Sequence, residues 1–165
     1  MEEPRTGAGE ATWALAMLLV AVGGGVALVG SILGWFRLSL WSSSGFFGRE
    51  LMGTETFSGT EDWTGVVAMS VGIIVVLLAV VSMIFAEARV RRLVGNAVAV
   101  GGILIAAAAL MAFLRVGQVT ASLDVGSGLA GTREGSAAFG MPISGLGGVL
   151  AVLGGFVARR LATSS

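Results

Sequence analysis

The chain of 165 residues contains no cysteine, histidine, tyrosine or lysine. Without thiolate or imidazole ligands, ordinary zinc, copper, haem and iron–sulfur sites are excluded, as are a disulfide framework and a Ser-His catalytic relay. Charge is also scarce, because charged residues make up 12% of the chain and ten basic residues balance ten acidic ones. We therefore expect no enzymatic activity, no catalytic residue, no cofactor, no metal and no nucleic-acid partner.

Hydrophobic residues, by contrast, make up 55% of the chain and gather in four long runs. As helices rising about 1.5 Å per residue, runs of this length approach or exceed the roughly 30 Å hydrocarbon core of a bilayer. A single segment in lipid satisfies its backbone polar groups only as a helix. The sequence thus predicts an all-α membrane protein, a single membrane domain whose four transmembrane helices form a bundle of two hairpins, with spans at about 12–36, 63–85, 94–114 and 140–158.

The first run could alternatively be a removable signal peptide. Its preceding segment, however, carries Glu2, Glu3 and Glu10 against Arg5, and the run is about twice as long as a typical apolar signal region. We therefore interpret it as a permanent span.

The arginines predict the orientation. Basic residues near span ends are retained in the cytoplasm, and the strongest cluster, Arg89, Arg91 and Arg92, lies between the second and third spans. We therefore expect a multi-pass protein of the bacterial plasma membrane with cytoplasmic N and C termini. The same cluster is expected to contact anionic lipid head groups. The tryptophans near span ends are expected at the membrane interface: Trp13, Trp35 and Trp63.

Two longer connections, 37–62 and 115–139, are then the outer loops. Apolar and polar residues alternate over 119–125 and, less regularly, over 37–42, which is the period of a half-buried strand. These segments predict either a small extracytoplasmic β cap in which the two pair with each other, or coil with chance alternation.

Small residues recur at four-residue spacing within the spans, a pattern that lets helix backbones approach closely. The predicted helix-interface residues are Gly30 and Gly34, Ala68 and Gly72, Ala97 and Gly101, and Gly147, Ala151 and Gly155. The first three pairs are expected to pack within the bundle, whereas the stripe in the last span is expected to face a partner. The spans lack ionisable residues, which argues against an ion-coupled carrier, and we expect their serines to bond to their own helix carbonyls.

Four segments carry a resemblance to a known family: Gly53-Thr54-Glu55-Thr56, Ser58-Gly59-Thr60-Glu61-Asp62-Trp63-Thr64-Gly65, Arg89-Val90-Arg91-Arg92-Leu93 and Gly140-Met141-Pro142-Ile143-Ser144-Gly145-Leu146-Gly147. With the four-span topology, they resemble the small actinobacterial membrane proteins of the tryptophan-associated transmembrane protein group. The resemblance covers most of the chain through topology and through glycine and tryptophan positions. It implies four spans, and it implies no role for any single residue because no catalytic motif defines the group.

Taken together, these features predict a non-catalytic accessory or scaffold subunit. Its expected partners are membrane lipid and either a larger membrane-protein complex or further copies of itself. An oligomeric pore or permease-like component is the main alternative. A subunit that contributes to a lipid or quinone pocket of an enzyme is a third.

Overall fold

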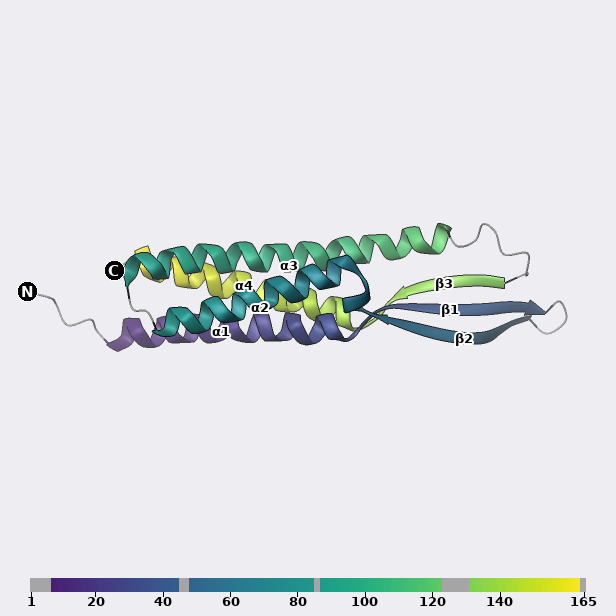
Figure 1. Ribbon diagram of the computed structural model, residues 1–165, viewed down its shortest axis with the longest axis horizontal. Helices are drawn as coiled ribbons and strands as arrows, with labels where there is room; N and C mark the ends of the chain where they lie inside the picture. Colours follow the sequence, from purple (N-terminus) through teal and green to yellow (C-terminus); the bar gives the residue numbers. More distant parts are fainter. Residues whose placement is uncertain (1–6, 45–47, 85–86, 123–130, 164–165) are drawn as a thin grey trace, which may run out of the picture.

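The computed structural model describes residues 7–44, 48–84, 87–122 and 131–163. Most of them are helical, and a small sheet accounts for much of the rest (Figure 1). In chain order the elements are α1 (Gly7–Ile32), β1 (Gly34–Ser44), β2 (Gly48–Ser58), the 3-10 turn η1 (Gly59–Glu61), α2 (Trp63–Ile84), α3 (Ala88–Ser122), β3 (Gly131–Ala137) and α4 (Gly140–Thr163).

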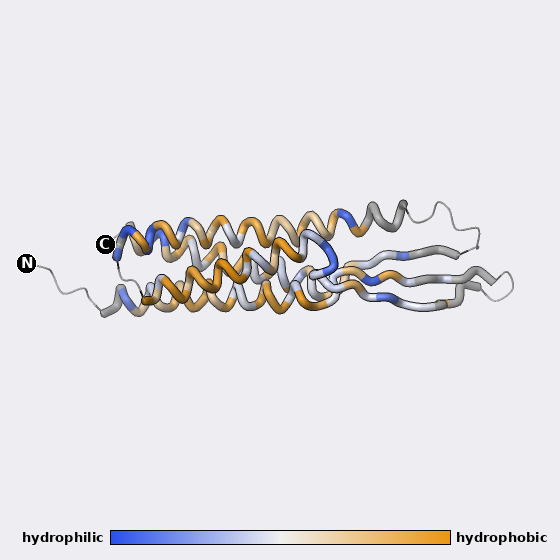
Figure 2. The backbone as a smooth tube through the Cα atoms, viewed as in Figure 1, coloured by the Kyte–Doolittle hydropathy of each residue, from blue (hydrophilic) through white to orange (hydrophobic). Residues whose placement is uncertain are grey.

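The four α-helices form one bundle. α1 and α3 lie diagonally opposite, and each packs against both α2 and α4. Every helix is long and apolar enough to cross a membrane, and large hydrophobic side chains remain exposed along the outside of the bundle. Figure 2 shows this apolar character along the helices, with hydrophilic residues at their ends and in the strands.

Several helix boundaries differ from the predicted spans, and those at the ends of α1 and α3 change the interpretation of the segments that follow. α1 ends at Ile32 rather than near Phe36, because the chain becomes extended at Gly34 and begins β1. α3 continues to Ser122, well beyond the predicted end near Leu114. The predicted strand over 119–125 is therefore wrong for residues 119–122, which are helical, while residues 123–125 lie outside the described part.

The sheet has the strand order β2-β1-β3, and both pairings are antiparallel. The predicted strand over 37–42 is confirmed and lies within β1. The predicted pairing of this strand with residues 119–122 is wrong, because β1 pairs with β2 and β3 instead. Arg37 lies opposite Thr56 of β2 and Ser136 of β3. A register shift between Leu40 and Trp41 marks an irregularity in the β1–β2 ladder.

The sheet extends from one end of the bundle, here called the sheet end, while the described ends of the chain, Gly7 and Thr163, lie at the opposite end (Figure 1). Backbone bonds extend the sheet into the bundle. The Ala138 N–H donates to the Trp35 carbonyl at 2.9 Å, and the Gly59 N–H donates to the Leu33 carbonyl at 3.2 Å. The connections are also short: one residue separates α1 from β1, and two residues separate β3 from α4.

An aspartate fixes the start of α2. The Asp62 carboxylate accepts a hydrogen bond from the Thr64 backbone N–H at 3.2 Å and another from the Thr64 hydroxyl. A side-chain oxygen in this position satisfies an N–H group that has no partner within the helix. Asp62 thus caps the N-terminal end of α2.

Candidate functional site

Glycines bring α3 and α4 into backbone contact. A Cβ atom placed on Gly102 would lie 2.7 Å from the Gly148 carbonyl oxygen, and one placed on Gly148 would lie 2.8 Å from the Gly102 carbonyl oxygen. Gly95 and Gly155 face each other in the same way, at 3.4 and 3.0 Å. The two pairs are separated by one heptad on each helix, a spacing that keeps two helices in contact along one seam.

A second glycine seam joins α4 to α1. A Cβ atom on Gly23 would lie 2.8 Å from the Gly147 carbonyl oxygen, and one on Gly140 would lie 2.6 Å from the Gly30 carbonyl oxygen. These pairs are also one heptad apart. α4 has glycines on two faces because it lies between α1 and α3, and each seam lets two backbones gain dispersion contacts.

Most of the predicted interface residues are buried in the bundle: Gly30, Ala68, Gly72, Gly101, Gly147, Ala151 and Gly155. Two are placed differently. Ala97 is exposed on α3, and Gly34 belongs to β1, where a Cβ atom would contact the Thr56 side chain of β2. Ala97 was predicted only because it lies four residues before Gly101, and this spacing does not indicate which side of α3 faces the other helices.

The small-residue stripe of α4 is covered by the protein's own helices. Gly147 faces α1, a Cβ atom on Gly23 of α1 would lie 2.7 Å from the Ala151 backbone nitrogen, and Gly155 faces α3. A four-residue step slightly exceeds a 3.6-residue turn, so the stripe winds around α4 from one neighbour to the other. This corrects the expectation that the stripe faces a partner.

The interior of the bundle is closed and almost free of polar groups. Among the described residues, the buried polar side chains are Ser31, Thr64, Ser82 and Ser144, and none of them is ionisable. The Ser31 hydroxyl donates to the Ala27 carbonyl at 2.8 Å, as predicted, and Ser82 donates to the Ala79 carbonyl at 2.8 Å. Within this part of the chain, no cluster of acidic residues could hold a metal ion.

Trp35 is the largest fully buried side chain, and it lies where β1 leaves α1. Its indole Nε1 donates to the Gly30 carbonyl at 2.9 Å. A Cβ atom on Gly59, just after β2, would lie 2.5 Å from the same Nε1. Trp35 therefore ties the end of α1 to the base of the sheet, and it does not occupy the exposed interface position that the sequence suggested.

The arginine cluster lies at the opposite end of the bundle, in the first turns of α3 rather than in a loop. Arg89 and Arg92 are exposed. Arg91 is half-buried and lies over the indole ring of Trp13, with its Cζ atom 5.0 Å from the ring centroid. Trp13 is itself only 4% exposed, so it packs under Arg91 instead of extending to an interface.

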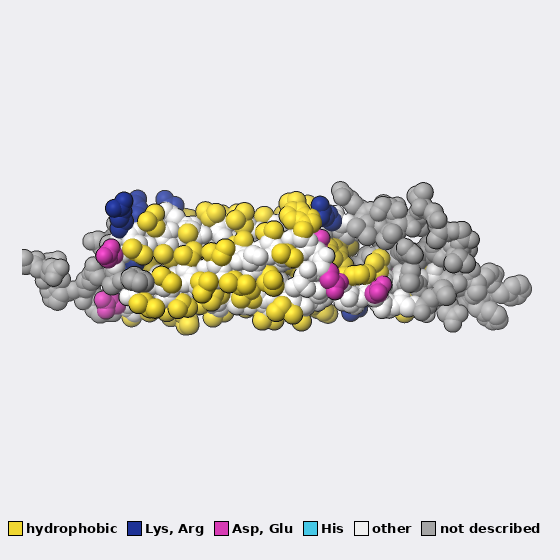
Figure 3. Space-filling view, viewed as in Figure 1, with side chains coloured by type: hydrophobic (Ala, Val, Ile, Leu, Met, Phe, Trp, Pro, Cys, Tyr) yellow, Lys and Arg dark blue, Asp and Glu magenta, His cyan; other side chains and the backbone are white. Residues whose placement is uncertain are grey.

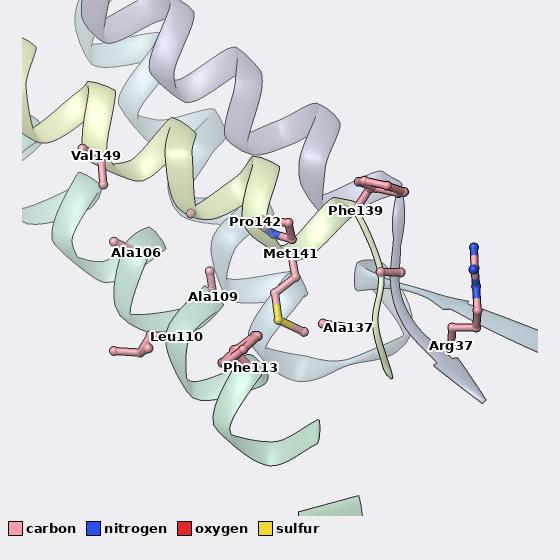
Figure 4. Close-up of a pocket in the computed structure, with 12 residues that line it drawn as sticks. Arg37, Ala106, Ala109, Leu110, Phe113, Ala137, Phe139, Met141, Pro142 and Val149 are labelled. Carbon is pink, nitrogen blue, oxygen red and sulfur yellow. The ribbon is translucent and has the colours of Figure 1, made fainter. Parts of the chain in front are cut away.

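A groove opens between α3 and α4 near the sheet. One heptad beyond Gly102 on α3 is Ala109, and one heptad before Gly148 on α4 is Met141. At this heptad position the seam therefore has the side chains of Ala109 and Met141 in place of a glycine pair. Toward the sheet, α4 diverges from α3 (Figure 1). A Cβ atom on Gly145 would meet only the Ala109 side chain, at 3.4 Å. Met141 points toward the ring of Phe113 within this space (Figure 4).

The groove has a volume of about 470 Å³ and a mostly apolar lining. Residues of α3 and α4 form its walls. At the sheet end it is bounded by residues of the sheet and by Phe139. Among the residues that the structure describes, Arg37 of β1 is the one charged residue in the lining. The exposed Arg37 side chain directs its guanidinium away from Met141 and Phe113 (Figure 4). This groove is not predictable from the sequence, since it depends on the register between α3 and α4.

Comparison with known proteins adds no assignment for this site. No family model matches the chain, and no curated protein matches it either. The resemblance to the tryptophan-associated transmembrane group therefore stays a prediction from the sequence.

Proposed function

We propose that this chain is a multi-pass protein of the bacterial plasma membrane that holds a three-stranded sheet at the outer membrane surface. In this role it serves a larger membrane complex, or a second copy of itself, as a non-catalytic accessory or scaffold subunit. The membrane location is supported by the apolar surface of the bundle. Figure 3 shows hydrophobic side chains along the bundle and charged side chains gathered toward its two ends.

The closed bundle interior is the observation that carries the scaffold role. Backbone contacts such as Gly102 with Gly148 and Gly23 with Gly147 bring α4 directly against α3 and α1, and the buried side chains of the described residues are almost all apolar. Ion and substrate pathways in membranes are instead marked by polar or ionisable side chains. This packing speaks against the pore alternative for a single bundle and directs attention to the outer surfaces.

The sheet is the surface best placed to meet a partner. It projects beyond the bundle (Figure 1), and β2 is an edge strand of the described sheet, paired on one side with β1. Edge strands offer unpaired backbone groups to which a partner strand can bind. Thr54, Glu55 and Thr56 of β2 are exposed, so this part of the edge is polar.

Site-specific photocrosslinking in intact cells tests the proposal. A photoreactive residue at Thr54 or Thr56 samples one face of β2, and one at Glu55 samples the other, because successive side chains alternate. We expect one discrete product from the face that meets the partner, at the mass of a dimer or of a defined complex. A probe at the exposed Leu77 of α2 is the control and should label lipid. If no sheet position gives a product and the purified protein is a monomer without associated subunits, the scaffold role is wrong.

A further inference from the structure

We propose that the groove between α3 and α4 binds one acyl chain of an anionic phospholipid, with the phosphate of the head group at Arg37. The inference rests on the membrane location proposed above. It adds a defined lipid site to a protein whose bundle surface is otherwise in general contact with lipid.

The groove has the shape and chemistry that an acyl chain requires. Its volume of about 470 Å³ lies within the range of roughly 300–1,000 Å³ that is common for ligand sites. The side chains around its opening are apolar and exposed, with Leu110 and Phe113 on α3 and Val149 on α4. The groove is therefore open toward the surrounding bilayer, and a chain can enter from the side without leaving the hydrocarbon region.

The position of Arg37 selects the head group. Arg37 lies at the sheet end of the groove, toward which the apolar stretch of α3, Arg89–Val116, ends. Its cross-strand neighbours, Thr56 and Ser136, are uncharged. No ion pair with Arg37 occurs in the part of the chain that the structure describes. A cation at the end of an apolar groove complements a lipid whose phosphate is negative and whose tail is apolar.

The groove lies where the pattern of facing glycines between α3 and α4 ends. Gly95 and Gly102 of α3 close the seam with α4, whereas Ala109 and Met141 hold the helices apart at the next heptad. The groove therefore borders a seam of direct backbone contact, which fixes the spacing of α3 and α4 beside it. A preformed site of this kind binds its ligand with little ordering cost.

The experiment uses the full-length protein in vesicles that contain equal amounts of phosphatidylglycerol and phosphatidylcholine. One of the two lipids carries a photoreactive acyl chain in each trial. After illumination, labelled peptides are identified and the ratio of phosphatidylglycerol to phosphatidylcholine labelling is measured. We expect labelling by phosphatidylglycerol to concentrate on residues around Phe113 and Met141.

Two pairs of matched variants separate the site from general lipid contact. Gly145→Leu fills the groove and should abolish the concentrated labelling, whereas Gly25→Leu, at a position with no atom within 4 Å of the added Cβ, should leave it intact. Arg37→Gln should lower the lipid preference about fivefold, which corresponds to about 1 kcal/mol for one basic residue at the membrane surface. Arg115→Gln removes the same charge at the sheet end but outside the groove lining, and should change the preference little.

The Arg37 pair keeps the test valid if Gly145→Leu disturbs folding, because Arg37 is exposed. Uniform labelling of all helix faces, or equal effects of Arg37→Gln and Arg115→Gln, would overturn the lipid site while leaving the membrane location intact. If no helix is labelled at all, the membrane location itself is contradicted.

Discussion

Gly102 of α3 and Gly148 of α4 exclude any side chain from the space between them, since a Cβ atom on either would lie within 2.8 Å of the other's carbonyl oxygen. The contact is possible only because neither residue has a side chain. Helix association at this point therefore differs from the interlocking of large side chains and tolerates less change in volume.

The first prediction concerns this contact. Gly148→Ala should lower the free energy of unfolding by about 1–3 kcal/mol, because the added methyl group forces the two backbones apart. Gly25→Ala is the matched control, as its added Cβ meets no atom within 4 Å. Thermal unfolding of both variants in a mild detergent measures the difference. Equal melting temperatures would contradict the close contact between α3 and α4.

The second prediction concerns the small-residue stripe of α4. Ala151 is fully buried, so Ala151→Leu should destabilise the monomer by about 1–3 kcal/mol through overpacking. Ala107→Leu, at an exposed position of α3, is the control and should melt like the unmodified protein. Size and thermal stability are measured together. Release of a partner with unchanged melting would show that the stripe faces outward after all.

The third prediction concerns the attachment of the sheet. Trp35→Phe removes the bond to the Gly30 carbonyl and leaves that acceptor buried, so the protein should lose at least about 1 kcal/mol of stability. Trp63→Phe changes a half-exposed indole and should have the smaller effect. Proteolysis of the sheet provides a second measurement, and we expect faster cleavage only in Trp35→Phe. The same cleavage rate in both variants would argue against this role of Trp35.

The fourth prediction separates two arginines of one cluster. Arg91→Gln removes the contact with Trp13 and should cost about 0.5–1 kcal/mol of stability. Arg89→Gln removes an equal charge from an exposed position and should leave stability unchanged. Because both variants alter the charge bias of the same segment equally, chemical denaturation reports the ring contact alone. A matching loss in both would assign the effect to charge instead.

The fifth prediction concerns orientation, and the absence of native cysteine makes it simple to test. Thr54→Cys on the sheet should react with a membrane-impermeant maleimide in intact cells. Glu87→Cys, exposed at the opposite end of the bundle, should react only after the cells are permeabilised. The reverse pattern would show that the sheet faces the cytoplasm.

The long elements were predictable because their signal is local. The apolar run at 63–85 corresponds closely to α2, and the alternation at 37–42 lies within β1. The alternation at 119–125 failed because the chain extends α3 through Ser122, and a few alternating residues do not distinguish a strand from the end of a helix. One partner of β1, the strand β3, lies far away in the sequence, so no local pattern identified it. The other, β2, follows β1 directly but was not recognised as a strand.

The glycine seams follow a seven-residue spacing, whereas the prediction used a four-residue spacing. Four-residue steps include Gly30, Gly147 and Gly155 but omit their facing residues, Gly140, Gly23 and Gly95. The heptad repeat of glycines in α1, α3 and α4 was the available signal. The groove could not be predicted, because it requires Met141 to lie across from Ala109, and that register follows only from the packed bundle.

The short connections between sheet and bundle have a mechanical consequence. β1 begins at Gly34, two residues after α1 ends, and α4 begins at Gly140, three residues after β3 ends. α1 and α4 are also the two helices that meet along a glycine seam at Gly30 and Gly140. A pull on the sheet therefore reaches these two helices directly and acts on them as a pair.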